Sequence, residues 1–107
     1  SIDVALPDGV RDAAYLETLD WLLPRSIDGF APDLVFYNAG VDPHENDRLG
    51  RLSLSDQGLK DRDRRVFSFF RERGMPVASV LGGGYSRDIE AVAGRHLLTF
   101  EAAAEFA

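Results

Sequence analysis

Hydrophobic residues recur at three- and four-residue spacing after the turn signal Pro7-Asp8-Gly9, and this spacing predicts an amphipathic helix with Asp12 as its N-cap. Pro24 interrupts the pattern. Because proline cannot donate the helical hydrogen bond, we expect a kink there, or a second short helix. The apolar face predicted for this segment comprises Tyr15, Leu16, Leu19, Leu22, Leu23, Ile27 and Phe30.

A second helix is predicted to start at Ser55 and Asp56, which are good capping residues. Arg71 and Arg73 in its last turn would complement the helix dipole, and Gly74 would end it in a left-handed conformation. The side chains expected on its buried face are Leu59, Val66, Phe67 and Phe70.

The continuous apolar run "DLVFYNAG" at 33–40 is typical of a strand covered on both faces, and "VASVL" at 77–81 predicts a second apolar strand. Ser86, Asp88 and Glu90 can start a last helix, although "HLLTF" within it fits a strand or a helix. The order helix, strand, helix, strand, helix predicts an α/β fold built on one parallel βαβ unit with flanking helices. Two parallel strands are few for a sheet of this kind, so the sheet should be incomplete.

Composition narrows the classes of function. The net charge of −6 over 107 residues argues against a general affinity for nucleic acid or anionic membrane, so neither is expected as a partner. The chain has no cysteine, which excludes disulfides and thiolate metal sites. No apolar run is long enough to span a bilayer, and we expect a cytoplasmic protein.

An acidic loop, residues 40–54, follows the first strand. Parallel α/β sheets bind their ligands at the ends of their strands. Asp42 and His44 offer a carboxylate and an imidazole to a divalent metal. On spacing alone, the simpler interpretation is that Asp42 accepts hydrogen bonds from its own loop, an Asx-type turn before Pro43. His44 is more typical of loop packing, and Asp47 of pairing with Arg48 or of bonding nearby amides.

Three glycines and Tyr85 follow the second strand. A glycine-rich turn can cradle phosphate, but no dinucleotide or P-loop motif is present. Alternatively, the glycines let the backbone approach a substrate while the Tyr85 hydroxyl donates to a developing oxyanion. A tight turn with Tyr85 as packing fits the residues equally well.

Taken together, "YNAGVD", "DRLGRLSLS", the Arg-Asp pair at 62–63 and "GGGY" occur in the order of the zinc-dependent histone deacetylase superfamily. The chain resembles the C-terminal part of that domain, most closely the class IV branch and bacterial acetoin-utilization-type deacetylases. The resemblance implies a partial three-layer arginase/deacetylase-like fold.

The same resemblance implies roles for individual residues. Asp42 matches a zinc-ligand aspartate, and Tyr85 matches the catalytic tyrosine that stabilises the oxyanion. Leu49, Gly83 and Gly84 match the lining of the substrate channel. Asp47 matches the acidic residue that supports the loop.

The family's catalytic histidine pair and its other two zinc ligands have no counterpart here, since His44 and His96 lie in different contexts. We therefore expect 1–107 to be a single C-terminal portion of a deacetylase domain whose N-terminal half is absent. The parent enzyme would use zinc to hydrolyse acetyl-lysine or a similar small acetamide, and the chain alone would be inactive and would not retain zinc. One alternative is a non-enzymatic module that forms homo-oligomers through its exposed sheet edges. A weaker one is an anion- or nucleotide-binding domain that uses residues 82–86.

Overall fold

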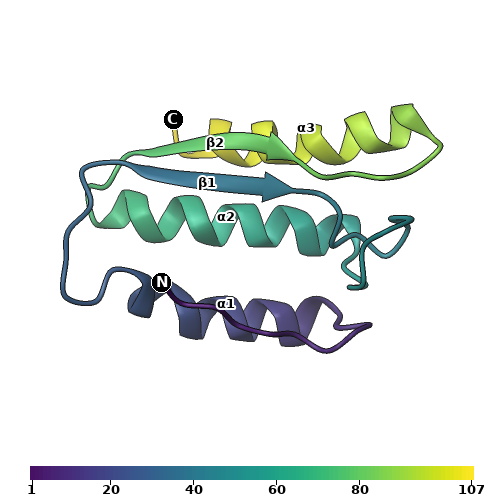
Figure 1. Ribbon diagram of the computed structural model, residues 1–107. Helices are drawn as coiled ribbons and strands as arrows, with labels where there is room; N and C mark the ends of the chain where they lie inside the picture. The colour runs from purple at the N-terminus through teal and green to yellow at the C-terminus, as the bar shows by residue number, and fades with distance from the viewer.

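The computed structural model describes residues 1–107 as three helices and two strands in the predicted order (Figure 1). The elements are α1 (Asp12–Ser26), β1 (Val35–Gly40), α2 (Asp56–Glu72), β2 (Val77–Gly82) and α3 (Ile89–Glu105). β1 and β2 are parallel neighbours whose register runs from Val35 opposite Val77 to Gly40 opposite Gly82. Both strands therefore deliver their following loops to the same edge of the sheet. This confirms the βαβ unit.

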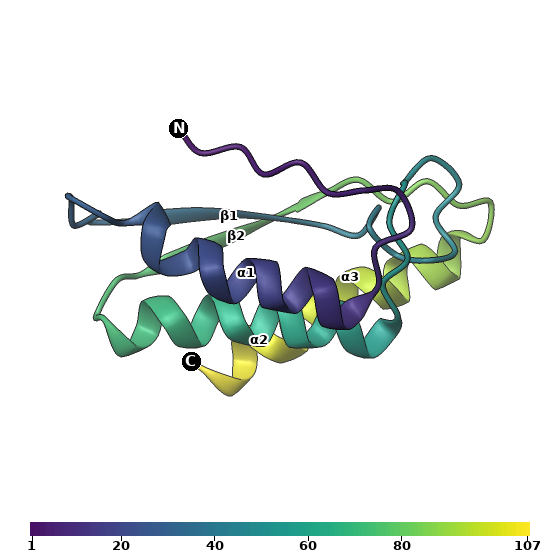
Figure 2. The same cartoon turned by 90° about the horizontal axis from the view of Figure 1, so that it is seen from below.

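The three helices lie on one side of the two strands, and the opposite face of the sheet carries no helix (Figure 2). Phe36 on that open face is 75% exposed and Val80 is 46% exposed. Consecutive strand side chains point to opposite faces, so cover on one side buries only alternate residues. The expectation that the first strand is covered on both faces is therefore wrong for this chain.

Helix α1 differs from the prediction at both ends. Arg11 takes the N-cap position, and the Asp12 carboxylate instead accepts hydrogen bonds from the amide and hydroxyl of Ser55. Pro24 lies inside the last turn, and the helix continues through it to Ser26 without restarting. Phe30 falls outside the helix and is 62% exposed, so it does not extend the buried face.

Helices α2 and α3 follow their sequence signals. The Ser55 hydroxyl accepts from the Gly58 amide at 3.0 Å, and all four side chains predicted for the buried face of α2 are buried. Gly74 has a φ of 69°, the left-handed conformation expected of a helix stop. Asp88 caps α3, and "HLLTF" is helical. No helix has both the length and the apolar character that crossing a bilayer would require.

The hydrophobic core has two parts. Leu23 of α1 packs with Val66 and Phe70 of α2, away from the loops. Val41, Leu54 and Leu59 are each fully buried in a second cluster directly beneath the acidic loop. The second cluster anchors that loop at both of its ends.

Candidate functional site

A pocket of about 370 Å³ lies where the two strands end. Its walls come from both predicted loops, from the strand ends and from two helices. The residues that line it are Tyr15, Asn38, Gly40, Asp42, Pro43, Arg62, Gly82, Gly83 and Tyr85. The structure thus brings together three residues predicted for the site, Asp42, Gly83 and Tyr85.

Asp42 reaches the pocket because its neighbour Val41 is fully buried and extends the sheet, with its amide donating to the Gly82 carbonyl at 3.2 Å. The Asp42 carboxylate accepts no hydrogen bond from any group of the chain, so the Asx-turn interpretation is wrong. A carboxylate with all its lone pairs available is suited to an external cation or donor.

The glycine turn, formed by the three glycines at 82–84, fits closely around this carboxylate. A Cβ on Gly83 would lie 2.1 Å from Asp42 Oδ1, and one on Gly84 would lie 2.9 Å from Val41 and Val92 side-chain atoms. Both glycines also have positive φ values, 61° and 99°. Any side chain at Gly83 would be strained and would displace the Asp42 carboxylate.

Tyr85 directly follows the glycine turn, and its side chain is half exposed. Its amide donates to Asp47 Oδ1 at 2.6 Å, and its carbonyl accepts from the Arg48 amide at 2.8 Å. An amide already bound to a carboxylate is not free to cradle phosphate, and the nearby Asp42 would repel an anion. The geometry therefore argues against the anion-binding alternative.

Asp47 accepts hydrogen bonds from three amides. Its second oxygen binds the amides of Leu49 at 3.0 Å and Gly50 at 2.7 Å. Desolvation by burial opposes ionisation, but the hydrogen bonds from Tyr85, Gly50 and Leu49 outweigh it and hold the pKa of Asp47 below its usual range. Of the two uses considered for this carboxylate, the structure shows the bonds to amides and no ion pair with Arg48.

His44 is buried and does not line the pocket. Its Nε2 lies 2.7 Å from Asp56 Oδ1, and its Nδ1 accepts from the Asn46 amide at 3.1 Å. Because Nδ1 is an acceptor, Nε2 carries the proton and donates to Asp56. His44 therefore packs and ties the loop to α2, as the loop-packing interpretation predicts. His96 lies under the glycine turn, with its Nε2 close to Gly84, and does not line the pocket.

Two predicted channel residues do not line the pocket. Leu49 is 62% exposed in the acidic loop, and Gly84 is packed against Val41 and Val92. Their assignment to the substrate channel stays a prediction. Sequence reasoning missed Gly50, where a Cβ would overlap the Asp42 carbonyl oxygen, only 1.8 Å away.

Arg62 also lines the pocket, although the sequence singled it out only as part of the Arg-Asp pair at 62–63. Its Nη1 donates to the Gly40 carbonyl at 2.6 Å, and its Nε donates to Asp63 at 2.9 Å. Asp63 is fully buried and also accepts from the hydroxyls of Tyr37 and, at 2.7 Å, Thr99. A charged pair on an otherwise apolar helix face was the available signal.

No group of three histidine, cysteine, aspartate or glutamate side chains is placed to hold a metal ion. A zinc site for hydrolysis needs three protein ligands and an open position. Asp42 is one suitable ligand, and neither histidine is beside it. The residues of this chain therefore do not make a complete zinc site.

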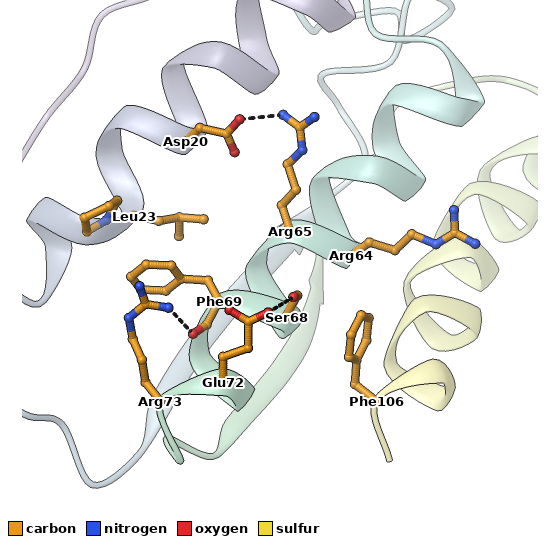
Figure 3. Close-up of a pocket in the computed structure, with 10 residues that line it drawn as sticks. Asp20, Leu23, Arg64, Arg65, Ser68, Phe69, Glu72, Arg73 and Phe106 are labelled. Atoms are coloured by element: carbon orange, nitrogen blue, oxygen red, sulfur yellow. Dashed lines mark hydrogen bonds and ion pairs between the residues drawn. The ribbon is translucent and has the colours of Figure 1, made fainter.

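A larger groove of about 460 Å³ lies between α1, α2 and the C-terminus, near the end where the strands begin (Figure 3). Arg65 pairs there with Asp20 at 3.0 Å, and Arg73 stacks on Phe69 and donates to its carbonyl at 2.8 Å. These charges are satisfied within the groove, and no predicted site residue lines it. We therefore assign this groove to the helix surface and not to the candidate site.

The sequence of residues 1–100 matches the family model of the histone deacetylase domain. The chain is 45% identical to an uncharacterised protein of Picosynechococcus sp. over 95% of its length, which is 34% of that relative. It is 39% identical to histone deacetylase 2 of Arabidopsis thaliana over 78% of the chain and 22% of the plant protein. The chain thus spans about a third or less of these relatives.

Solved structures of related proteins have the same fold over nearly the whole of this chain. A histone deacetylase homologue complexed with SAHA superimposes with a TM-score of 0.78 at 27% identity, over 96% of this chain and 26% of that one. Acetylpolyamine aminohydrolase from Burkholderia pseudomallei gives a TM-score of 0.75 at 24% identity, over 98% of this chain and 29% of that one. These matches confirm a partial arginase/deacetylase-like α/β fold.

Proposed function

Because the chain belongs to the histone deacetylase domain family, we propose that it supplies part of the active site of a deacetylase that hydrolyses acetyl-lysine or a similar small acetamide. The observation that carries the proposal is the meeting of Asp42 and Tyr85 in one pocket at the carboxyl edge of a parallel sheet. Open α/β sheets bind their substrates at this edge.

In this proposal Asp42 is one zinc ligand, and the remaining ligands come from residues outside this chain. Its free carboxylate and the close fit of Gly83 around it support that role, since a ligand needs unshared lone pairs and a fixed position. Bound zinc would serve as the Lewis acid of the amide hydrolysis.

Tyr85 donates its hydroxyl proton in a hydrogen bond to the oxygen that becomes negative when the acetamide carbonyl turns tetrahedral. A donor already aimed at that oxygen stabilises the transition state more than the substrate, and so raises kcat. The half-exposed Tyr85 lines the same pocket as Asp42, which supports this role. Gly83, Gly84 and Leu49 would border the path of the acyl group.

The isolated chain would be inactive, because one carboxylate and one phenol lack the base and the metal site. Its exposed sheet edges, together with the open sheet face that carries Phe36 and Val80, would favour self-association when the rest of the domain is missing.

The test compares two samples by native mass spectrometry and by release of acetate from an acetyl-lysine peptide. One is the chain alone, and the other is a complete domain, in which this chain is joined to the rest of the deacetylase fold. We expect zinc and activity only in the complete domain. One zinc per isolated chain, or activity of a stable monomer, would contradict the proposal.

A further inference from the structure

The acidic loop and the glycine turn are joined by a single side chain, Asp47. One carboxylate oxygen accepts from the Tyr85 amide at 2.6 Å. The other accepts from the amides of Leu49 and Gly50, within the loop itself. Asp47 is therefore held by its own loop while it holds the residue after the neighbouring strand.

A second hydrogen bond joins the acidic loop to the residue after the glycine turn. The amide of Arg48, the residue after Asp47, donates to the Tyr85 carbonyl at 2.8 Å. The peptide groups on both sides of the Tyr85 Cα are thus bound to the acidic loop. Fixing these two groups sets the direction in which the Tyr85 side chain leaves the backbone.

The two residues before Tyr85 are glycines, which restrain the backbone less than other residues do. Gly83 and Gly84 precede it in left-handed conformations, and glycine has the largest conformational freedom in the unfolded chain. No side chain of the chain hydrogen-bonds the Tyr85 hydroxyl. The position of the phenol therefore depends on its backbone, which the Asp47 carboxylate and the Arg48 amide hold.

From these contacts we infer that Asp47 is a positioning residue for catalysis: its carboxylate locks the Tyr85 backbone to the acidic loop, so that the Tyr85 side chain is held in the pocket that Asp42 also lines. This goes beyond support of its own loop. It rests on the proposed function, because it assigns Asp47 an effect on the rate that acts through Tyr85.

The first test is a double-mutant cycle in the complete domain, with Asp47→Asn, Tyr85→Phe and the pair. Asp47→Asn keeps the size of the side chain and weakens its acceptor capacity. We expect it to lower kcat by up to about 100-fold with little change in KM, because misplacing a catalytic group affects the transition state. In the Tyr85→Phe background the same change should have no further effect. A further loss of the same size there would show that Asp47 does not act through the Tyr85 hydroxyl.

Glu45→Gln is the matched control. Glu45 lies in the same loop, is exposed, and makes no side-chain hydrogen bond, so the change removes one negative charge without touching the connection. We expect unchanged kcat. A comparable loss of kcat in this control would assign the effect to charge and overturn the inference.

The second test does not depend on catalysis. Hydrogen exchange of the segment 82–86 should be faster in Asp47→Asn than in the unchanged domain, and unchanged in Glu45→Gln. Equal exchange rates in Asp47→Asn and in the unchanged domain would show that Asp47 does not hold this segment. Faster exchange together with a fully active Tyr85→Phe would show that the connection exists but that the proposed role of Tyr85 is wrong.

If Asp47→Asn does not fold, Asp47→Glu keeps the carboxylate and moves it by one methylene. We expect an intermediate kcat, normal zinc content and an unchanged KM. A normal kcat together with normal exchange in this variant would contradict the inference.

Discussion

Asp63 and Asp42 are carboxylates near the same end of the sheet with opposite surroundings. Asp63 is fully buried and accepts from Arg62, Tyr37 and Thr99. Asp42 borders a pocket and accepts from no group of the chain. Burying a charge is costly unless it is paired and hydrogen-bonded, so Asp63 is committed to the fold. The free Asp42 is available for a ligand.

The comparison separates two kinds of acidic residue that sequence alone presents as alike. Arg62 links them, because it pairs with Asp63 and also donates to the carbonyl of Gly40, two residues before Asp42. The structural carboxylate therefore helps to hold the strand end that presents the free one.

The largest effect on stability is expected from Asp63→Ala. Removing one partner of a buried ion pair leaves Arg62 uncompensated and should destabilise the complete domain by about 3–5 kcal/mol. Denaturant unfolding of Asp63→Ala and of the unchanged domain measures the difference. A loss below about 1 kcal/mol would mean that water reaches the site and that Asp63 is not a structural carboxylate.

Tyr85→Phe should have the largest effect on activity. Removing one oxyanion donor costs about 100- to 1,000-fold in kcat, while the half-exposed hydroxyl contributes little to folding. Steady-state kinetics and zinc analysis of the same preparation check both parts. Unchanged kcat would remove Tyr85 from the mechanism.

Tyr37→Phe tests the surroundings of Asp63, the structural carboxylate. It removes the hydroxyl that donates to Asp63, and leaving this buried acceptor short of a partner should cost about 1–3 kcal/mol. Activity at a temperature where both proteins are folded should be retained. Loss of activity without loss of stability would show that Tyr37 contributes to function and not only to the fold.

Tyr37 also predicts a dependence of stability on alkaline pH. Burial raises the pKa of its phenol well above the ordinary value, the charge of Asp63 and the hydrogen bond to it add to this, and Arg62 opposes it. The folded state then keeps a proton that the unfolded state releases above about pH 10. The free energy of unfolding should therefore fall as pH rises beyond that point. In Tyr37→Phe this part of the pH dependence should disappear, which denaturant unfolding at pH 9 and pH 11 would show.

Asp42→Asn should have the smallest effect on stability, within about 0.5 kcal/mol in the absence of metal, since no bond of the chain is lost. Its zinc content, measured by native mass spectrometry, should fall well below that of the unchanged domain. Full zinc occupancy would refute its role as a ligand.

The sequence by itself determined the order and type of the five elements. Local signals such as the Ser55 cap, the apolar face of α2 and the Gly74 stop act within a few residues, and the structure follows them. Signals failed where a distant partner intervened. Asp12 does not cap its own helix, because its carboxylate bonds Ser55, 43 positions away.

The site depended on tertiary structure in the same way. The residues at 42 and 85 were found from motif order, but only the parallel pairing of β1 and β2 places their loops together. Likewise, the spacing of Asp42, Asp47 and Asp63 could not distinguish their roles, because a carboxylate's role depends on its donors. Those donors, Tyr85 for Asp47 and Thr99 for Asp63, lie 38 and 36 positions away in the sequence. Folding alone decides which acid is paired and which is left free.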